Sequence, residues 1–231
     1  MELLDIIKST EYSGIKNMAY TVGTLNKILD RGIYEGVKYL LVEVKSLKDK
    51  TSVACTHIIL PDSEISLEKI NNNELVFAQG ILVATFGFNT NAVKHVFIKP
   101  NVVKILEKDF ETEKLKDFCL EYTKYNRIVL DCEVYSDTVE KTSKKGDRKF
   151  KSFKILFTDE KENSRTMACM IWDTIDGLPQ IKKGDKIKIV GSMYIKDIKE
   201  KEGMKTHYTI YVQNILLNNV NAENLSQSLF I

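Results

Sequence analysis

Cysteine is sparse in this chain of 231 residues, and the cysteine pairs that hold metals are missing. The four cysteines are scattered without a Cys-x-x-Cys pair, which argues against a zinc site and against a disulfide framework. They are Cys55, Cys119, Cys132 and Cys169. Three of them lie in apolar, strand-like runs, as is typical of reduced core cysteines in a cytoplasmic protein.

Long apolar runs and a strong charge of one sign are missing too. No apolar run approaches the roughly 18 residues that a membrane helix needs, and the first residues are too acidic for a signal peptide. These absences predict a cytoplasmic protein without membrane contact. The 34 basic and 32 acidic residues leave a net charge of +2, so the position of the charges matters more than their sum.

The motifs that mark enzymes are absent. The sequence has no Gly-rich phosphate loop, no His/Cys/Asp cluster with metal spacing and no nucleophile motif. His57, His95 and His207 are isolated strand residues, for which we expect structural roles. The sequence therefore predicts a non-catalytic protein that needs no metal or other cofactor.

What the chain does have is alternation of apolar and polar residues with a period of two, which predicts strands. In residues 17–106 it predicts five strands, with a turn at 30–32 and a short helix between the third and fourth strands. The fifth strand is expected to break or bulge at Pro100. In residues 127–219 it predicts five more strands, with a short connector at the corresponding place.

These two stretches form an internal repeat. Gly80 in ELVFAQGILV corresponds to Gly191 in DKIKIVGSMY, and HVFIKPNVVKIL corresponds to HYTIYVQNILL. A strand can bend sharply at a glycine. Five strands with an insert between the third and fourth are typical of the OB-fold, a five-stranded Greek-key barrel. A pair of small β-sandwiches is the alternative.

The expected fold is therefore all-β with minor helices, built from two five-stranded OB-fold barrels in tandem. Its parts are an N-terminal helical segment (1–16), OB-fold domain 1 (17–106), a linker helix (107–126), OB-fold domain 2 (127–219) and a flexible tail (220–231).

The second repeat resembles the OB domain of bacterial-type single-stranded DNA-binding proteins. The resemblance lies in MACMIWD, in IKKGDKIKIVGSMYI and in a hairpin loop at 197–205 that leads into HYTIYVQNILL. The opening of the first repeat, NMAYTVGTLNKILDRGIYEGVKYLLVEV, is similar to the start of such domains. In that family an aromatic side chain on the third strand stacks on a base. Trp172, the only tryptophan, occupies the matching position.

Rings and cations gather in the second repeat, where 18 Lys and Arg stand against 14 Asp and Glu in residues 127–219. Rings stack on bases and cations neutralise phosphates. Alternation puts six such side chains on one strand face, namely Phe150, Trp172, Tyr194, Lys154, Lys188 and Lys196. The two hairpin loops add Lys141, Lys144, Lys145, Arg148, Lys149, Lys151 and Lys205.

In the first repeat the matching outward row is apolar. It holds Leu75, Phe77, Gln79, Ile81 and Val83. An apolar face must be covered, either by the linker helix, by the other barrel or by a second copy in a homo-oligomer. We therefore expect binding mainly in the second repeat and assembly mainly in the first, with Tyr20 and Tyr39 as weaker candidates for DNA contact.

The resulting hypothesis is a non-catalytic single-stranded DNA-binding protein of a phage, plasmid or bacterial replication or recombination system, with low sequence specificity. The alternative is an OB-fold adaptor for protein interactions in a replication or secretion assembly. Binding of RNA stays open as well, because stacking and phosphate contacts serve both nucleic acids.

Overall fold

The computed structural model describes residues 16–46, 54–63, 74–84, 95–106, 126–143, 146, 148–175, 177–200 and 203–217. These residues form eleven β-strands and no helix, which confirms the predicted all-β class. A helix able to cross a membrane is accordingly not found in these ranges. Several predicted features lie outside the described residues: the N-terminal helical segment up to residue 15, the short helix after Pro61, the linker helix before Asn126, and the tail.

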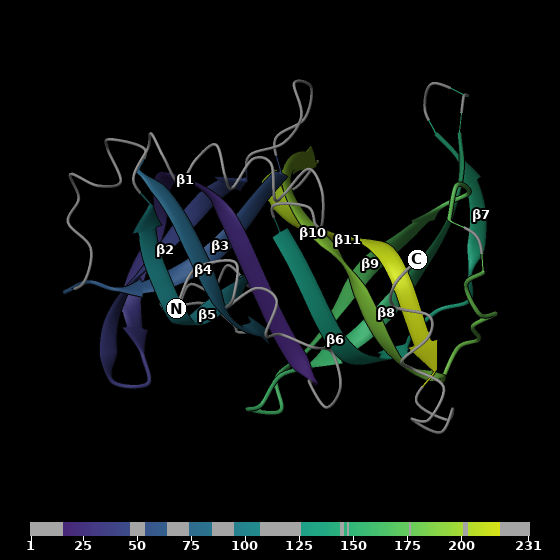
Figure 1. Ribbon diagram of the computed structural model, residues 1–231, viewed down its shortest axis with the longest axis horizontal. Helices are drawn as coiled ribbons and strands as arrows, with labels where there is room; N and C mark the ends of the chain where they lie inside the picture. The colour runs from purple at the N-terminus through teal and green to yellow at the C-terminus, as the bar shows by residue number, and fades with distance from the viewer. Residues whose placement is uncertain are drawn as a thin grey trace.

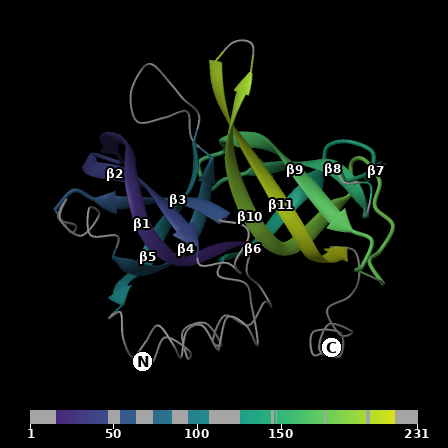
Figure 2. The ribbon, with the colours of Figure 1, turned by 90° about the horizontal axis from the view of Figure 1, so that it is seen from above.

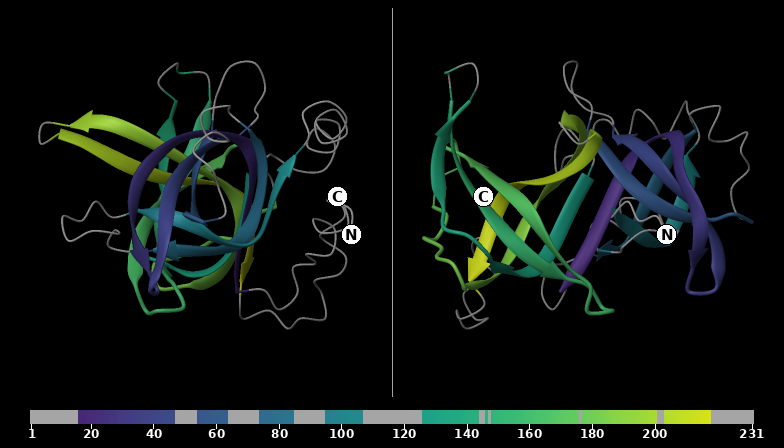
Figure 3. Two further views of the ribbon diagram at one scale, coloured as in Figure 1. Left: turned by 90° about the vertical axis from the view of Figure 1, so that its left-hand side faces the viewer. Right: turned by 180° about the vertical axis from the view of Figure 1, so that it is seen from behind.

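The first five strands form a closed circuit that we call the N-terminal ring. They are β1 (Asn17–Tyr34), β2 (Val37–Ser46), β3 (Ala54–Pro61), β4 (Leu75–Ala84) and β5 (Val96–Leu106). Hydrogen bonding runs in the order β1-β2-β3-β5-β4 and returns from β4 to β1. Only the β3–β5 pair of this ring is parallel. Figure 3 shows these strands wrapping around a common centre.

The remaining strands repeat this circuit as the C-terminal ring. They are β6 (Asn126–Val134), β7 (Val139–Thr142), β8 (Lys149–Thr158), β9 (Ser164–Trp172), β10 (Lys186–Glu200) and β11 (Gly203–Leu217). The order is β6-β8-β9-β11-β10 and back to β6, again with one parallel pair, β9–β11. The short β7, which the sequence did not predict, pairs with β8 outside this circuit.

Two strand pairings join the rings. β1 pairs with β6, and the two lie side by side in the middle of Figure 1. β3 touches β10 at the Cys55–Ile195 pair. All eleven strands therefore belong to one continuous sheet, and the division into two separate domains at the predicted boundaries stays a prediction.

The repeated glycines lie opposite a β-bulge in each ring. Gly80 of β4 faces Pro100 where β5 has one extra residue, and Gly191 of β10 faces Val212 where β11 has one. A Cβ atom at Gly80 would overlap the backbone oxygen of Lys99, and one at Gly191 would lie 2.5 Å from the backbone oxygen of Tyr211. The predicted bulge at Pro100 and the predicted match of the two glycines are both confirmed.

A pair of asparagines repeats as well, which was not among the features predicted from the sequence. Asn17 opens β1, and its side chain bonds both backbone groups of Leu82, two residues after Gly80. Asn126 opens β6, and its Oδ1 accepts a 2.9 Å bond from the Met193 amide, two residues after Gly191. In both rings an asparagine thus fixes the first strand to the fourth just beyond the bulge.

Two predicted turns were placed wrongly. β1 continues through residues 30–32 and turns at Glu35–Gly36, where both residues have positive φ, because this conformation matches the twist of a two-residue hairpin. The predicted loop at 197–205 is mostly strand, since β10 and β11 pair from Ile187–Leu217 out to Glu200–Gly203. Figure 2 shows the far ends of β10 and β11 projecting from the body as a hairpin.

The cores follow the predicted alternation. Val76, Ala78 and Leu82 of β4 belong to the main core, as do Ile187 and Ile189 of β10. Val83 of the predicted outward row joins Leu41, Ile59 and Phe97 in a second apolar cluster, in which each residue is at most 2% exposed, and Ile81 packs against it. Leu29, Tyr34 and Tyr39 of the β1–β2 hairpin pack against this cluster. The ring thus covers part of its own outer face, which was not among the expected covers.

Candidate nucleic-acid interface

The outer face of the C-terminal ring carries the side chains that alternation assigns to it. On β8, Phe153, Ile155 and Phe157 are buried, whereas Phe150 is half-buried and Lys154 is exposed. On β9, Met167, Cys169 and Ile171 are buried, which turns Trp172 to the opposite face. The predicted rows of these two strands are therefore confirmed.

Four rings form a continuous chain across this face, which we call the aromatic ribbon. Phe150 lies opposite Trp172 in the β8–β9 ladder, with ring centroids 5.4 Å apart. Trp172 stacks on Tyr211 at 6.4 Å with an interplanar angle of 19°. Tyr211 meets Tyr194 edge-on at 4.4 Å. The ribbon thus crosses β8, β9, β11 and β10, and each ring is held by its neighbour.

Tyr211 links the two ends of this ribbon, and the sequence reasoning missed it. The signal was present, because Tyr208, Ile210 and Val212 of β11 are all buried and Tyr211 falls on the alternate row. Burial, followed by the nearby Tyr194, raises the pKa of Tyr211 above its ordinary value. The phenol therefore stays neutral at physiological pH and keeps a ring suited to stacking.

Cations flank the ribbon. Lys141 of β7 pairs with Phe150 and is exposed. Lys196 is exposed on β10 and pairs with His207. Arg148, immediately before β8, is exposed as well, whereas Lys144 and Lys145 lie outside the described residues.

Not all of the predicted lysines come together. Lys188 lies six residues before Tyr194 on β10, and its Nζ pairs with Asp131 of β6 at 3.1 Å. Lys149 and Lys151 are exposed but alternate with Phe150, so they extend from the opposite face of the β7–β8 hairpin. The structure therefore separates these three lysines from the aromatic ribbon.

Lys154 and Lys205 meet instead in a groove of about 550 Å³ beside the ribbon. Residues of β8, β9 and β11 line it, together with Ala84, the last residue of β4. The register places it next to the ribbon, because Lys154 pairs with Ala168, Ala168 with Thr209, and Thr209 with Tyr194.

The N-terminal ring has no comparable row of accessible rings among its described residues. Tyr20 is only 2% exposed and contacts Phe77, and Tyr39 packs on the outer apolar cluster. Lys99, directly before the bulge at Pro100, takes the position that Tyr211 has before Val212. It bonds the Glu35 carboxylate instead of stacking.

The described residues were also compared with the patterns that hold metal ions and with those of reactive thiols. Groups of three or more His, Cys, Asp or Glu that could hold a metal ion are not found among these residues. Cys132 and Cys169 are buried thiols, and burial raises the pKa of Cys132 to about 12. Such thiols are suited to packing rather than to nucleophilic attack.

Comparison with known proteins relates this fold to that of DNA-binding proteins. No family model matches the sequence, and no curated protein matches it either. Among solved structures, the wild-type single-stranded DNA-binding protein of Thermus aquaticus matches with a TM-score of 0.56 at 12% identity, over 88% of this chain and 93% of that one. A deletion mutant of that protein matches with a TM-score of 0.56 at 13% identity, over 90% and 98%. The chain therefore has the OB-type fold of single-stranded DNA-binding proteins, which confirms the predicted resemblance at the level of fold.

Proposed function

We propose that this chain is a non-catalytic protein that binds single-stranded DNA with little sequence preference. The observation that carries the proposal is the aromatic ribbon of Phe150, Trp172, Tyr211 and Tyr194. Every base has a face that stacks on a ring, and one such contact contributes about 1–3 kcal/mol whatever the base. A row of rings across a strand face therefore grips single strands without reading their sequence.

Binding of a nucleic acid also requires cations that neutralise its phosphates, and the lysines beside the ribbon supply them. Lys141 and Lys196 lie beside the two ends of the ribbon, where they can neutralise phosphates of a strand whose bases lie on the rings. A duplex keeps its bases stacked inside the helix, so the ribbon favours single strands. The Thermus aquaticus protein that shares the fold is itself a single-stranded DNA-binding protein. The proposal further places the chain in a phage, plasmid or bacterial replication or recombination system.

Fluorescence of the single tryptophan tests the proposal directly, because Trp172 lies inside the ribbon. We expect an oligo-dT of about 16 nucleotides to quench this fluorescence, and the affinity to fall steeply as salt rises. A duplex of equal length should quench much less. Failure of every oligonucleotide to quench, together with unchanged anisotropy of a labelled oligo-dT, contradicts the proposal.

The same titration with oligo-rU addresses the nucleic acid itself. Equal affinities for rU and dT would make the chain a general binder of single strands, because stacking and phosphate contacts do not depend on the 2′-hydroxyl. A preference for rU of tenfold or more would replace DNA by RNA in the proposal.

A further inference from the structure

The groove beside the aromatic ribbon has a lining that favours phosphate. It contains three cationic side chains, Lys154, Arg165 and Lys205, and three aliphatic hydroxyl groups, those of Ser164, Thr166 and Thr206. Among the described residues that line it, none is Asp or Glu. Lysine, arginine and hydroxyl side chains are the groups that most often contact the sugar-phosphate backbone of DNA.

Arg165 is held in place at the bottom of this lining. Its guanidinium lies over the ring of Tyr208, with Cζ 4.6 Å from the ring centroid. Arg165 is only partly exposed to water, and this burial lowers the pKa of its guanidinium below the ordinary value. A poorly solvated cation gains more from an anion than an exposed one does, because the effective dielectric constant around it is lower.

The groove also leads from one ring to the other. Most of its lining belongs to β8, β9 and β11 of the C-terminal ring, but Ala84 belongs to β4 of the N-terminal ring. A strand that follows the groove away from the ribbon therefore reaches the junction between the rings.

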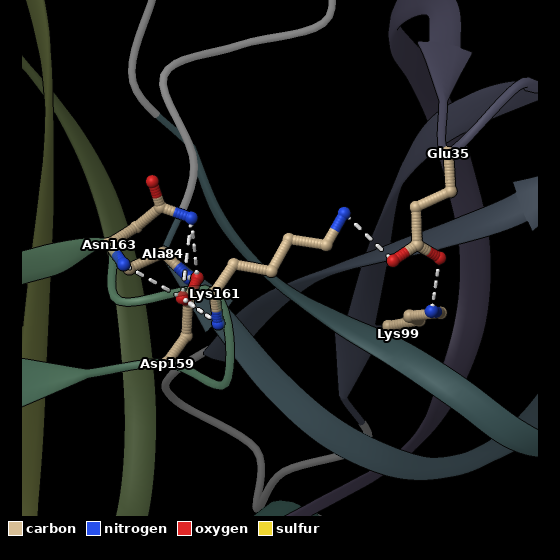
Figure 4. Close-up of polar contacts among 6 residues, drawn as sticks. All are labelled: Glu35, Ala84, Lys99, Asp159, Lys161 and Asn163. Atoms are coloured by element: carbon tan, nitrogen blue, oxygen red, sulfur yellow. Dashed lines mark hydrogen bonds and ion pairs between the residues drawn. The ribbon is translucent and has the colours of Figure 1, made fainter.

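Asp159 fixes this junction at Ala84, which lines the groove. Its Oδ2 accepts a 3.1 Å hydrogen bond from the Ala84 amide, while its Oδ1 accepts bonds from the amides of Lys161 and Asn163 at 2.9 and 3.0 Å. The residue is only 7% exposed. Figure 4 shows Asp159 reaching Ala84, and Lys161 extending from the same turn to Glu35 of the N-terminal ring at 2.8 Å.

We propose that this groove holds the sugar-phosphate backbone of the bound strand as it leaves the aromatic ribbon, and guides it from the C-terminal ring to the junction with the N-terminal ring. The inference rests on the proposed binding of single strands. In it Lys154, Arg165 and Lys205 contact phosphates, and Asp159 is a positioning residue that sets the groove wall at Ala84.

Two lengths of oligo-dT separate the groove from the ribbon. An oligonucleotide of about 4 nucleotides is long enough for the ribbon, whereas one of about 16 nucleotides also fills the groove. We expect the double variant Lys154→Gln/Lys205→Gln to weaken binding of the long oligonucleotide at least tenfold and that of the short one far less. The slope of log affinity against log salt should fall by about 1 for each lysine removed.

Lys182→Gln/Lys183→Gln is the matched control for charge. These two exposed lysines belong to the turn before β10, outside the groove, and their removal changes the net charge by the same amount. The control should keep most of the affinity for the long oligonucleotide. Equal losses of affinity in the two double variants would overturn the proposed role of the groove, because they would show only a general effect of charge.

Asp159→Ala tests the positioning role, because this role and simple charge repulsion predict opposite changes in affinity. Removing a carboxylate near DNA strengthens binding if the carboxylate only repels phosphate. We expect the variant instead to bind the long oligonucleotide several-fold more weakly, while Glu160→Ala, an exposed carboxylate of the same turn, does not weaken it. Tighter binding by Asp159→Ala would overturn its positioning role.

The same titrations distinguish a failed groove from a failed function. If both oligonucleotides quench Trp172 in the wild type and the two groove lysines can be removed without loss of affinity or salt slope, the groove is wrong and the ribbon stands. If neither oligonucleotide quenches or binds, the proposed function fails and the groove fails with it.

Discussion

The two rings share one strand order but use their outer faces in different ways. In the N-terminal ring, Leu41, Ile59, Val83 and Phe97 form a closed apolar cluster under the β1–β2 hairpin. In the C-terminal ring, the corresponding strands present the half-exposed aromatic ribbon. The fold therefore does not dictate a binding face. A strand circuit that covers its outer aromatic side chains with its own hairpin gains stability. A circuit that leaves these side chains accessible keeps a surface on which bases can stack.

The position before the bulge shows this difference in a single pair of residues. Tyr211 completes the ribbon, whereas Lys99 at the matching place bonds Glu35 of the hairpin and lies 5.5 Å from the ring centroid of Tyr34. Hydrogen bonds from Lys161 and then from Lys99 lower the pKa of Glu35 below its ordinary value. Lys99 thus binds the hairpin of its own ring, and Glu35 in turn joins this hairpin to Lys161 of the other ring.

Truncation of one aromatic side chain on each outer face should give the largest effect and test the difference between the two faces. Phe97 is fully buried among apolar neighbours, so Phe97→Ala should lower the free energy of unfolding by about 3–5 kcal/mol. Tyr211→Ala should instead weaken oligo-dT binding by about 1–3 kcal/mol, with a much smaller loss of stability. Urea unfolding and fluorescence titration measure the two effects. The difference between the faces is refuted if Tyr211→Ala costs as much stability as Phe97→Ala and leaves binding intact.

Substitution of the paired glycines should give the next largest effect, a loss of stability that differs between the two bulges. A Cβ at Gly80 would overlap backbone atoms of Lys99 and Pro100, whereas one at Gly191 meets mainly the Tyr211 oxygen. We expect Gly80→Ala to cost about 3 kcal/mol or more and Gly191→Ala about 2 kcal/mol, because a packed backbone yields only with strain. Thermal and urea unfolding of both variants measure these costs.

Gly177→Ala is the control for the glycine pair. Its φ is +75° and nothing lies within 4 Å of an added Cβ, so it tests backbone strain without a clash and should cost about 1–2 kcal/mol. If Gly80→Ala proves no more costly than this control, close approach is not what requires glycine in β4.

The sequence predicted the strands better than the turns and the contacts between strands. Period-two alternation and the repeated Gly80 and Gly191 were sufficient for the class, for the core rows and for the bulges, because burial and steric overlap act on each strand separately. The turn at Glu35–Gly36 was missed because Asp30 and Gly32 carry an equally good turn signal. Register alone decides between them.

The site was predictable to the same extent. Alternation placed Phe150, Trp172 and Tyr194 on the outer face, but the ribbon also needs Tyr211, which connects them through the parallel β9–β11 pair. Pairing between strands distant in sequence is what alternation does not contain. The same limit explains Lys188: the sequence shows its face but not Asp131 opposite it.

The contact between the two strand rings should make the free energy of unfolding depend on pH. At mildly acidic pH this is the smallest of the predicted effects. His57 lies within β3 and His95 directly before β5. Their imidazole centroids are 5.8 Å apart, and that of His57 is 6.0 Å from the ring of Tyr208 in the C-terminal ring. Burial, followed by the neighbouring His95, lowers the pKa of His57 from 6.5 to about 3, and burial lowers the pKa of His95 in the same direction. Asp197 opposes both shifts without reversing them.

The sign of the pH dependence follows from these directions. Below pH 6.5 the unfolded chain binds protons that the folded chain excludes, so the free energy of unfolding should fall as pH decreases toward 3. One pH unit below 6.5 the loss for His57 is about 1.4 kcal/mol. Urea unfolding at pH 7.5, 6.5 and 5.5 measures it, with His57→Gln expected to flatten the dependence and His207→Gln, whose ring is not buried, expected to retain it. A wild-type slope in His57→Gln would mean that His57 is not the acid-sensitive group.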